Sequence, residues 1–266
     1  MKYLYLLVLA LFAGYIFILV FVYFNQRNLL YHPTENNYLD DQIQFNYEEV
    51  FIETEKNIKL KSWFIKKNLE KYKTLVFFHG NAGNLLNRVH KLNELNKLDI
   101  NIFIVSWRSF SENPGTPTEK NLYNDAKESI KWLNNKGVQN NRIILYGESL
   151  GTGVAVELGQ KNIFNSIILE SPFTSIEKAA KIYYPYLPIK LLLKDRYDSI
   201  NKINKITKPI LIMHGIKDDI VPYTMGEDLF KKANNPKYSY FPKNDNHMMD
   251  FNEELLKQIK KFVEKY

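Results

Sequence analysis

A serine stands between two glycines in the segment Gly147-Glu148-Ser149-Leu150-Gly151, directly after a short apolar run and directly before a helical pattern. This G-x-S-x-G spacing is typical of a tight strand-to-helix turn that pushes the serine hydroxyl out at the carboxyl end of a strand. The positive end of the following helix then lies beside the hydroxyl. We interpret Ser149 as a nucleophile rather than as a residue of an ordinary turn.

A second glycine-rich segment, His79-Gly80-Asn81-Ala82-Gly83-Asn84, follows the apolar run 75–78. A loop of this kind can present a backbone N–H to an oxyanion, and the residue after the nucleophile supplies a second N–H. We therefore expect the backbone N–H groups of Asn81 and Leu150 to form an oxyanion hole. The alternative is a tight turn, and for His79 itself we favour a structural role.

Two adjacent carboxylates, Asp218 and Asp219, follow the apolar run Ile210–Met213. A carboxylate at a strand end can orient a histidine and stabilise its protonated form. Pro222 suits the first turn of a helix, so Asp219 fits a loop or capping role and Asp218 is the preferred acid. Of the five histidines, His247 alone follows this acid in the chain, which completes the order serine, aspartate, histidine.

These residues need a framework, and the chain from residue 46 to 266 predicts one α/β domain. Residues 49–53 and 59–65 alternate polar and apolar positions, as in a half-exposed antiparallel pair. Short continuous apolar runs, typical of a parallel sheet buried on both faces, follow at 75–78, 102–105, 143–146, 167–169 and 210–213. Helical patterns separate them, for example at 85–98, 119–134 and 150–160, so we expect a mostly parallel, doubly wound sheet.

The first residues of the chain have a different character. Residues 3–24 form an uncharged apolar run of 22 positions. As a helix this run would be about 33 Å long, which matches a hydrocarbon core of about 30 Å. The run is longer than the apolar region of a cleavable signal peptide, and no small-residue cleavage site follows it. We expect an uncleaved transmembrane anchor over residues 1–24.

Residues 25–45 are polar, contain Pro33, and are expected to form an irregular tether between the anchor and the domain. The orientation of the anchor rests on one charge. Lys2 and the α-amino group precede the apolar run, whereas Arg27 follows it, with no further lysine or arginine before Lys56. This difference favours a single-pass protein whose domain lies on the non-cytoplasmic side.

Composition excludes several classes of protein. The 266 residues are 45% hydrophobic and 24% charged, as in a globular chain, and the absence of cysteine excludes a disulfide scaffold and a thiol nucleophile. The formal charge of +7 is compatible with anionic lipid or nucleic acid, but no motif of interleaved aromatic and basic residues supports nucleic acid as a partner. No H-E-x-x-H motif or phosphate-binding loop occurs, so no metal or cofactor is expected.

Taken together, the motifs resemble those of the α/β-hydrolase superfamily, and more narrowly its membrane-tethered α/β-hydrolase domain-containing serine hydrolases. The matching segments are His79 to Asn84, Gly147 to Gly151, Ser171-Pro172-Phe173-Thr174-Ser175, His214-Gly215 with Asp218, and Gln26 to Pro33. The resemblance implies an esterase-type fold with a serine–aspartate–histidine triad, and hydrolysis of esters, thioesters or lipids.

The expected function is therefore a membrane-anchored serine hydrolase that forms an acyl-enzyme on Ser149 and takes a small-molecule or lipid ester. A catalytically silent binding scaffold and an acyltransferase with the same triad are the alternatives. Fewer than forty residues separate Ser171 from Pro209, so any cap over the site is small. Within this stretch, residues 183–188 either line an acyl pocket or form a packed connector. The sequence does not indicate an oligomeric state.

Overall fold

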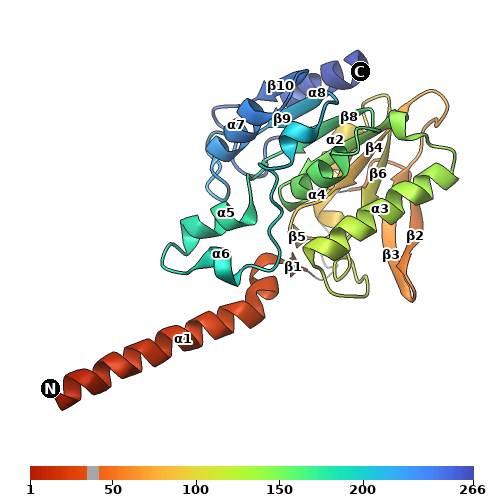
Figure 1. The fold of residues 1–266 in the computed structure, drawn as a ribbon. Coiled ribbons are helices and arrows are strands. Elements are labelled where there is room, and N and C mark those ends of the chain that lie inside the picture. Colours follow the sequence, from red (N-terminus) through yellow and green to blue (C-terminus); the bar gives the residue numbers. More distant parts are fainter. Residues whose placement is uncertain (35–41) are drawn as a thin grey trace.

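The computed structural model describes residues 1–34 and 42–266, and over these residues its centre is an eight-stranded sheet (Figure 1). The strand order is β10-β9-β8-β7-β4-β6-β3-β2, and neighbouring strands are parallel except in the pairs β2–β3 and β3–β6. The strands are β2 (Glu48–Glu55), β3 (Ile58–Ile65), β4 (Lys73–Phe78), β6 (Ile100–Val105), β7 (Ile143–Glu148), β8 (Ser166–Glu170), β9 (Ile210–Met213) and β10 (Lys237–Tyr240). The predicted parallel sheet with antiparallel N-terminal strands is confirmed.

Helices cover both faces of the sheet, because successive side chains of each strand point to opposite sides. In β4, Leu75 and Phe77 pack with α2 and α8, whereas Val76 and Phe78 pack with α3, α4 and α7. These helices are α2 (Val89–Leu95), α3 (Glu119–Asn135), α4 (Leu150–Gly159), α7 (Tyr223–Lys232) and α8 (Glu253–Lys265). Short 3₁₀ turns lie at Leu86–Arg88, Asn140–Arg142 and Ile203–Lys205.

The helix expected over residues 85–98 is shorter than predicted. Its first turn is the 3₁₀ turn that precedes α2, in which the Arg88 N–H donates to the Leu85 carbonyl at 3.0 Å. Asn84 and Asn87 bind each other's backbone N–H groups through their side-chain oxygens, at 2.8 and 3.3 Å. Side chains that compete for backbone groups in this way favour turns over continuous helix.

The N-terminal helix α1 (Lys2–Leu30) projects from the domain, and none of its residues is buried (Figure 1). Among the described residues it is the one helix long and apolar enough to cross a membrane, a property that anchors and signal sequences share. The helix continues six residues past the predicted anchor. The expectation of an irregular tether is therefore wrong for residues 25–30.

The segment after α1 is also ordered against the domain. Residues His32–Pro33 form a short strand, β1, that pairs in parallel with β5 (Ala82–Gly83) in the glycine-rich loop after β4. Tyr31 is buried, and its hydroxyl lies 2.9 Å from that of Tyr197. Arg27 donates to Asp195 at 3.0 Å. The polar residues that suggested a tether are thus bound to the domain. The predicted tether also includes residues 35–41, which lie outside the described residues.

A small cap lies between β8 and β9, as predicted from the short connection there. It contains α5 (Ile176–Tyr183) and α6 (Ile189–Leu192), and we call residues 176–196 the cap segment. Figure 1 shows the cap segment next to the C-terminal half of α1, away from the helices that cover the sheet. The cap segment and α1 therefore form one side of the molecule.

The turn between β7 and α4 depends on the absence of side chains at its glycines. A Cβ at Gly151 would overlap the backbone carbonyl of Phe78, so α4 could not lie this close to β4. A Cβ at Gly153 would instead meet the side chain of Tyr197, with its nearest atom at 2.8 Å. The overlap at Gly151 is the more severe of the two, because it involves the backbone of a central strand at a much shorter separation.

We expect Gly151→Ala to destabilise the domain far more than Gly153→Ala, because overpacking against a backbone cannot be relieved by a rotamer change. Chemical denaturation of the two variants beside the wild-type protein measures the difference in unfolding free energy. Equal losses in the two variants would contradict this account of the turn.

Candidate active site

Ser149 occupies the turn between β7 and α4 with a backbone conformation that non-glycine residues rarely adopt, φ 48° and ψ −113°. Its N–H donates to the Glu170 carbonyl at 2.9 Å, which fixes the turn to the neighbouring strand β8. Strain of this kind persists only where the surroundings impose it, and it is typical of functional sites. The hydroxyl is consequently presented at the carboxyl edge of the sheet.

His247 lies in the loop between β10 and α8 and reaches this hydroxyl. Its Nε2 is 2.9 Å from the Ser149 Oγ, and its Nδ1 is 2.7 Å from the Asp218 Oδ2. The loop is held by Ser171, whose hydroxyl donates to the His247 carbonyl at 2.7 Å. Ser171 was quoted from the sequence only as part of a family motif, and its role in holding this loop is a finding of the structure.

Asp218 is buried in the loop after β9 and accepts four hydrogen bonds. Its Oδ1 accepts from the N–H groups of Ile220 and Val221 at 2.9 and 2.8 Å. Its Oδ2 accepts from His247 and from Nε2 of His214, the latter at 2.8 Å. Burial alone would raise the pKa of this carboxyl, but the two histidines and the Val221 N–H lower the pKa well below its usual range. The carboxylate is therefore ionised at neutral pH.

The structure distinguishes the two adjacent aspartates. The Asp219 side chain is exposed, and its carbonyl accepts a hydrogen bond from the Tyr183 hydroxyl at 3.1 Å. The geometry therefore places Asp218, and not Asp219, beside the two imidazoles. His214, which belongs to one of the matching sequence segments but had no predicted role, is a second support for this carboxylate.

The two residues expected to supply the oxyanion hole line the same cavity as Ser149. Leu150 is the first residue of α4, where a backbone N–H has no acceptor within the helix. Asn81 is held by the end of α1: its carbonyl accepts from the His32 N–H, and its side chain donates to the Leu30 carbonyl, both at 2.7 Å. The loop that would bind an oxyanion is thus fixed from outside the α/β domain.

His79 stays apart from the triad and is completely buried. Its Nδ1 lies 2.8 Å from the Gly80 carbonyl, and the Trp107 N–H points to its Nε2 at 3.5 Å. Burial, with a contribution from the nearby Arg88 guanidinium, lowers the pKa of His79 to about 3. A neutral imidazole that donates from Nδ1 satisfies both contacts. This arrangement supports the structural role favoured from the sequence.

A buried ion cluster lies beneath the turn at Ser149, and no pattern in the sequence predicts it. Lys91 bridges the carboxylates of Glu148 and Glu170 at 2.9 and 2.5 Å, and Arg88 binds the other oxygen of Glu148. Burial would raise the pKa of Glu148, but the two cations lower the pKa well below its usual range. The same carboxylate accepts from the Gly80 N–H at 3.1 Å. Glu148 therefore connects the turn at Ser149 to the glycine-rich loop 79–84.

The cavity above Ser149 has apolar walls. It contains ≈ 740 Å³ of empty space, including the part open to solvent. Tyr183 and Tyr184 of the cap segment contribute to it, so this part of the apolar stretch 183–188 does line a pocket. Leu29 and Leu30 of α1 line it as well, which the sequence did not predict. Among the described residues, no group of three or more histidine, aspartate or glutamate side chains could hold a metal ion.

The fold and the site define an α/β-hydrolase, and comparison with known proteins agrees. Residues 108–266 match the prolyl oligopeptidase family. An uncharacterized protein of Mycobacterium tuberculosis is 32% identical over 92% of this chain and 90% of its own. The α/β-hydrolase domain-containing protein WAV2 of Arabidopsis thaliana is 30% identical over 83% of this chain and 79% of its own. The chain therefore belongs to the α/β-hydrolase superfamily, with a prolyl oligopeptidase family domain over residues 108–266.

Among solved structures, an esterase of Pyrococcus furiosus superposes with a TM-score of 0.72. It is 22% identical in sequence, and the match covers 89% of this chain and 99% of the esterase. This likeness establishes the esterase-like α/β-hydrolase fold that the sequence predicted.

We expect Asp218→Asn to lower turnover by several orders of magnitude, because an amide would favour the wrong tautomer of His247, a change worth about 10⁴ in serine proteases. Asp219→Asn is the matched control, and it should cost at most about tenfold, since its side chain is exposed. Turnover of a short p-nitrophenyl ester, with circular dichroism to check folding, measures both. A larger loss of turnover in Asp219→Asn than in Asp218→Asn would identify Asp219 as the carboxylate that orients His247.

His79 should make stability dependent on pH. In the unfolded chain its imidazole binds a proton below its ordinary pKa of about 6.5, whereas the folded protein binds that proton only near pH 3. The unfolding free energy should therefore fall by about 1.4 kcal/mol per pH unit from this group as pH drops from 6.5 to 3.

The variant His79→Gln, whose amide can still donate to the Gly80 carbonyl, isolates this contribution. Denaturation curves at several pH values give the unfolding free energy as a function of pH. Between pH 6.5 and 3, the slope of this function should be smaller in the variant by the equivalent of one proton. Identical slopes would mean that His79 is not kept neutral in the folded protein.

Proposed function

We propose that this protein is a serine hydrolase that cleaves carboxylic esters or thioesters through an acyl-enzyme. The observation that carries the proposal is the continuous hydrogen-bonded chain from the Ser149 Oγ through His247 to Asp218, with distances of 2.9 and 2.7 Å. The chain ends on a strained serine at the edge of an apolar cavity. A nucleophile, a base and an orienting carboxylate in this order are the groups that acyl transfer requires.

In the proposed reaction, Nε2 of His247 accepts the hydroxyl proton while the Ser149 Oγ attacks the acyl carbonyl. The N–H groups of Asn81 and Leu150 stabilise the oxyanion. The bond between the carbonyl carbon and the leaving oxygen or sulfur then breaks, and His247 gives its proton to the leaving group. Water, deprotonated by His247, attacks the acyl-enzyme, releases the acid and restores the serine. Asp218 keeps the imidazole in the required tautomer throughout.

A silent binding scaffold and an acyltransferase are the rival functions. A scaffold has no need of the strained backbone at Ser149 or of an ionised Asp218, so both features support catalysis. An acyltransferase would use the same residues with an alcohol in place of water. Product analysis in the presence of an added alcohol separates the two reactions.

We further propose that α1 anchors the enzyme as a single membrane span with the domain on the non-cytoplasmic side. The apolar part of α1 continues without a break into residues that bind the domain, namely Gln26, Arg27 and Tyr31. This continuity supports a retained anchor over a cleaved signal peptide. The orientation follows from the positions of Lys2 and Arg27 at the two ends of the apolar run.

One labelling experiment tests both proposals. A membrane-impermeant fluorophosphonate, added to intact cells that express the full chain, should label the wild-type protein and not Ser149→Ala. The variant should also lose hydrolysis of p-nitrophenyl butyrate, because no other group replaces the nucleophile. Product analysis with added alcohol detects acyl transfer.

The contrary outcomes are distinct. Labelling that survives in Ser149→Ala would place the nucleophile elsewhere. A folded wild-type protein that never reacts, even after permeabilisation, would support the scaffold. Labelling of the wild-type protein only after permeabilisation would leave the enzyme assignment intact and reverse the proposed orientation.

A further inference from the structure

The cap segment lies along the apolar part of α1 for a considerable distance. The Tyr15 hydroxyl donates to the Tyr186 carbonyl at 3.0 Å, and the Gln26 side chain donates to the Leu192 carbonyl at 3.0 Å. The same amide accepts from the Lys194 N–H at 2.7 Å. Eleven positions of α1 separate Tyr15 from Gln26, which is about 16 Å of helix. If this part of α1 is inserted in a bilayer, the cap segment must therefore contact the bilayer as well.

The surface of the cap segment suits such a contact. Large apolar side chains are exposed on it, including Tyr186 at 68% and Leu191 at 83%. Exposed basic side chains accompany them, at Lys178, Lys181, Lys190, Lys194 and Arg196. Apolar side chains with basic neighbours are typical of elements that lie in the interface of a membrane with anionic lipids.

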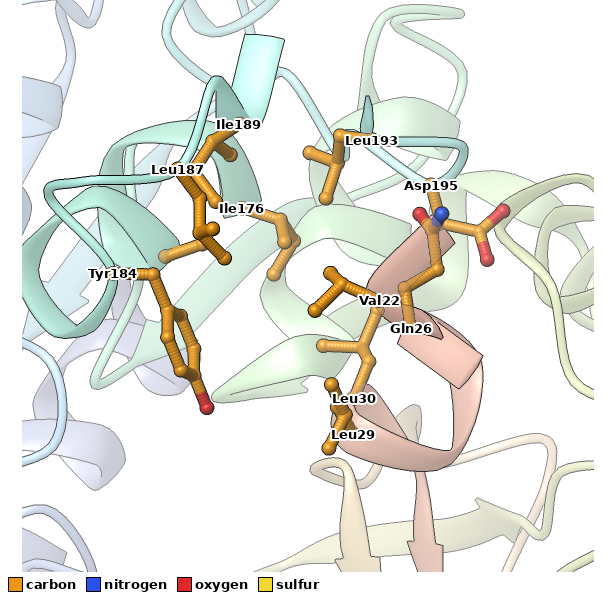
Figure 2. A pocket seen from close by; sticks show the side chains of 11 residues that line it. Val22, Gln26, Leu29, Leu30, Ile176, Tyr184, Leu187, Ile189, Leu193 and Asp195 are labelled. Carbon is orange, nitrogen blue, oxygen red and sulfur yellow. The ribbon is translucent and has the colours of Figure 1, made fainter. Parts of the chain in front are cut away.

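Between α1 and the cap segment lies an apolar groove, shown in Figure 2, with ≈ 590 Å³ of empty space including its open part. Val22, Leu29 and Leu30 of α1 face Leu187 and Leu193 of the cap segment across it (Figure 2). The two polar residues in its wall are already bonded to protein groups. Gln26 binds Leu192 and Lys194, and Asp195 binds Arg27.

This groove adjoins the cavity above Ser149. Five residues line both spaces: Leu29, Leu30, Ile176, Ala180 and Tyr184. An apolar surface therefore leads from the candidate nucleophile to Val22, which lies inside the apolar run of α1. One end of this surface is at Ser149, and the other end lies just inside the apolar run of α1.

We propose that the acyl chain of a bilayer lipid ester enters between α1 and the cap segment and occupies this groove while its ester carbonyl reaches Ser149. The inference rests on the proposed hydrolase function and membrane anchor, and it names the substrate class. The occupant is an acyl chain because the walls are apolar and because the groove opens at the apolar part of α1. The substrate then never has to leave the bilayer completely.

Two valines of α1 provide a matched test. Val22 lines the groove, whereas Val20 is 50% exposed and does not. Full-length Val22→Trp and Val20→Trp are reconstituted in vesicles of phosphatidylcholine and phosphatidylglycerol. Turnover is measured with 4-methylumbelliferyl oleate in the vesicles and with soluble p-nitrophenyl acetate. The ratio of long- to short-chain turnover should fall about tenfold in Val22→Trp, equivalent to about 1.4 kcal/mol, and stay at the wild-type value in Val20→Trp.

A second variant acts where the two spaces meet. Ala180→Phe fills the junction, and the ratio should fall in it as well. If the ratio is unchanged in both Val22→Trp and Ala180→Phe, the groove does not hold the acyl chain and the inference is wrong. If the wild-type protein hydrolyses neither ester, the proposed hydrolase function fails instead, so the two failures are distinguishable.

The contact with the bilayer has its own readout. Tyr186→Trp in the cap segment should be quenched by lipids with brominated acyl chains. Phe51→Trp, on the exposed side of the edge strand β2, is the control and should not be quenched. Absence of quenching at position 186 would place the cap segment outside the bilayer and would overturn entry of the chain by this route.

Discussion

The geometry of the candidate site depends on the carboxylate of Glu148, which is buried beneath Ser149 between Arg88 and Lys91. Glu148 directly precedes Ser149, and its carboxylate also accepts from the N–H of Gly80, which directly precedes Asn81. One charged group thus fixes the turn at Ser149 and the glycine-rich loop 79–84 relative to each other. Removal of one partner from a buried ion pair typically costs about 3–5 kcal/mol, because the remaining charge is left uncompensated. The cluster therefore imposes one arrangement on two loops that are far apart in the sequence.

The glycine-rich loop 79–84 is held on its other side by the end of α1 and the residues that follow it. Strand β1 pairs with β5 within this loop, and Leu30 accepts from the Asn81 side chain. The loop is consequently clamped between the ion cluster inside the domain and the N-terminal segment outside it. The N-terminal segment is part of the site as well as a connection to α1, because it contributes both a wall of the cavity and a support for a backbone donor.

The sheet and the elbow could be predicted because their signals are local: continuous apolar runs, and glycines at fixed spacing around Ser149. Long-range partners left no such signal. The helical pattern around Lys91 predicts a solvent-exposed side chain. Its partners, Glu148 and Glu170, lie 57 and 79 positions away in the sequence. Polar residues after Phe24 likewise indicated a tether, although Gln26 and Arg27 are good helix formers whose partners lie in the cap segment. Sequence alone cannot show which surface a polar side chain will meet.

The ordered junction at Tyr31 and Tyr197 has a mechanical consequence. A helix whose apolar length exceeds the local hydrocarbon thickness tilts, and bilayers differ in thickness by several ångströms between membranes. A flexible linker between helix and domain would make the orientation of the domain independent of the tilt of the helix. Here the hydroxyl pair and the bond between Arg27 and Asp195 connect α1 firmly to the domain, so the face that carries the candidate site would tilt together with a membrane-spanning α1. For a spanning α1, the thickness of the membrane sets the angle at which the mouth of the site meets the lipid surface.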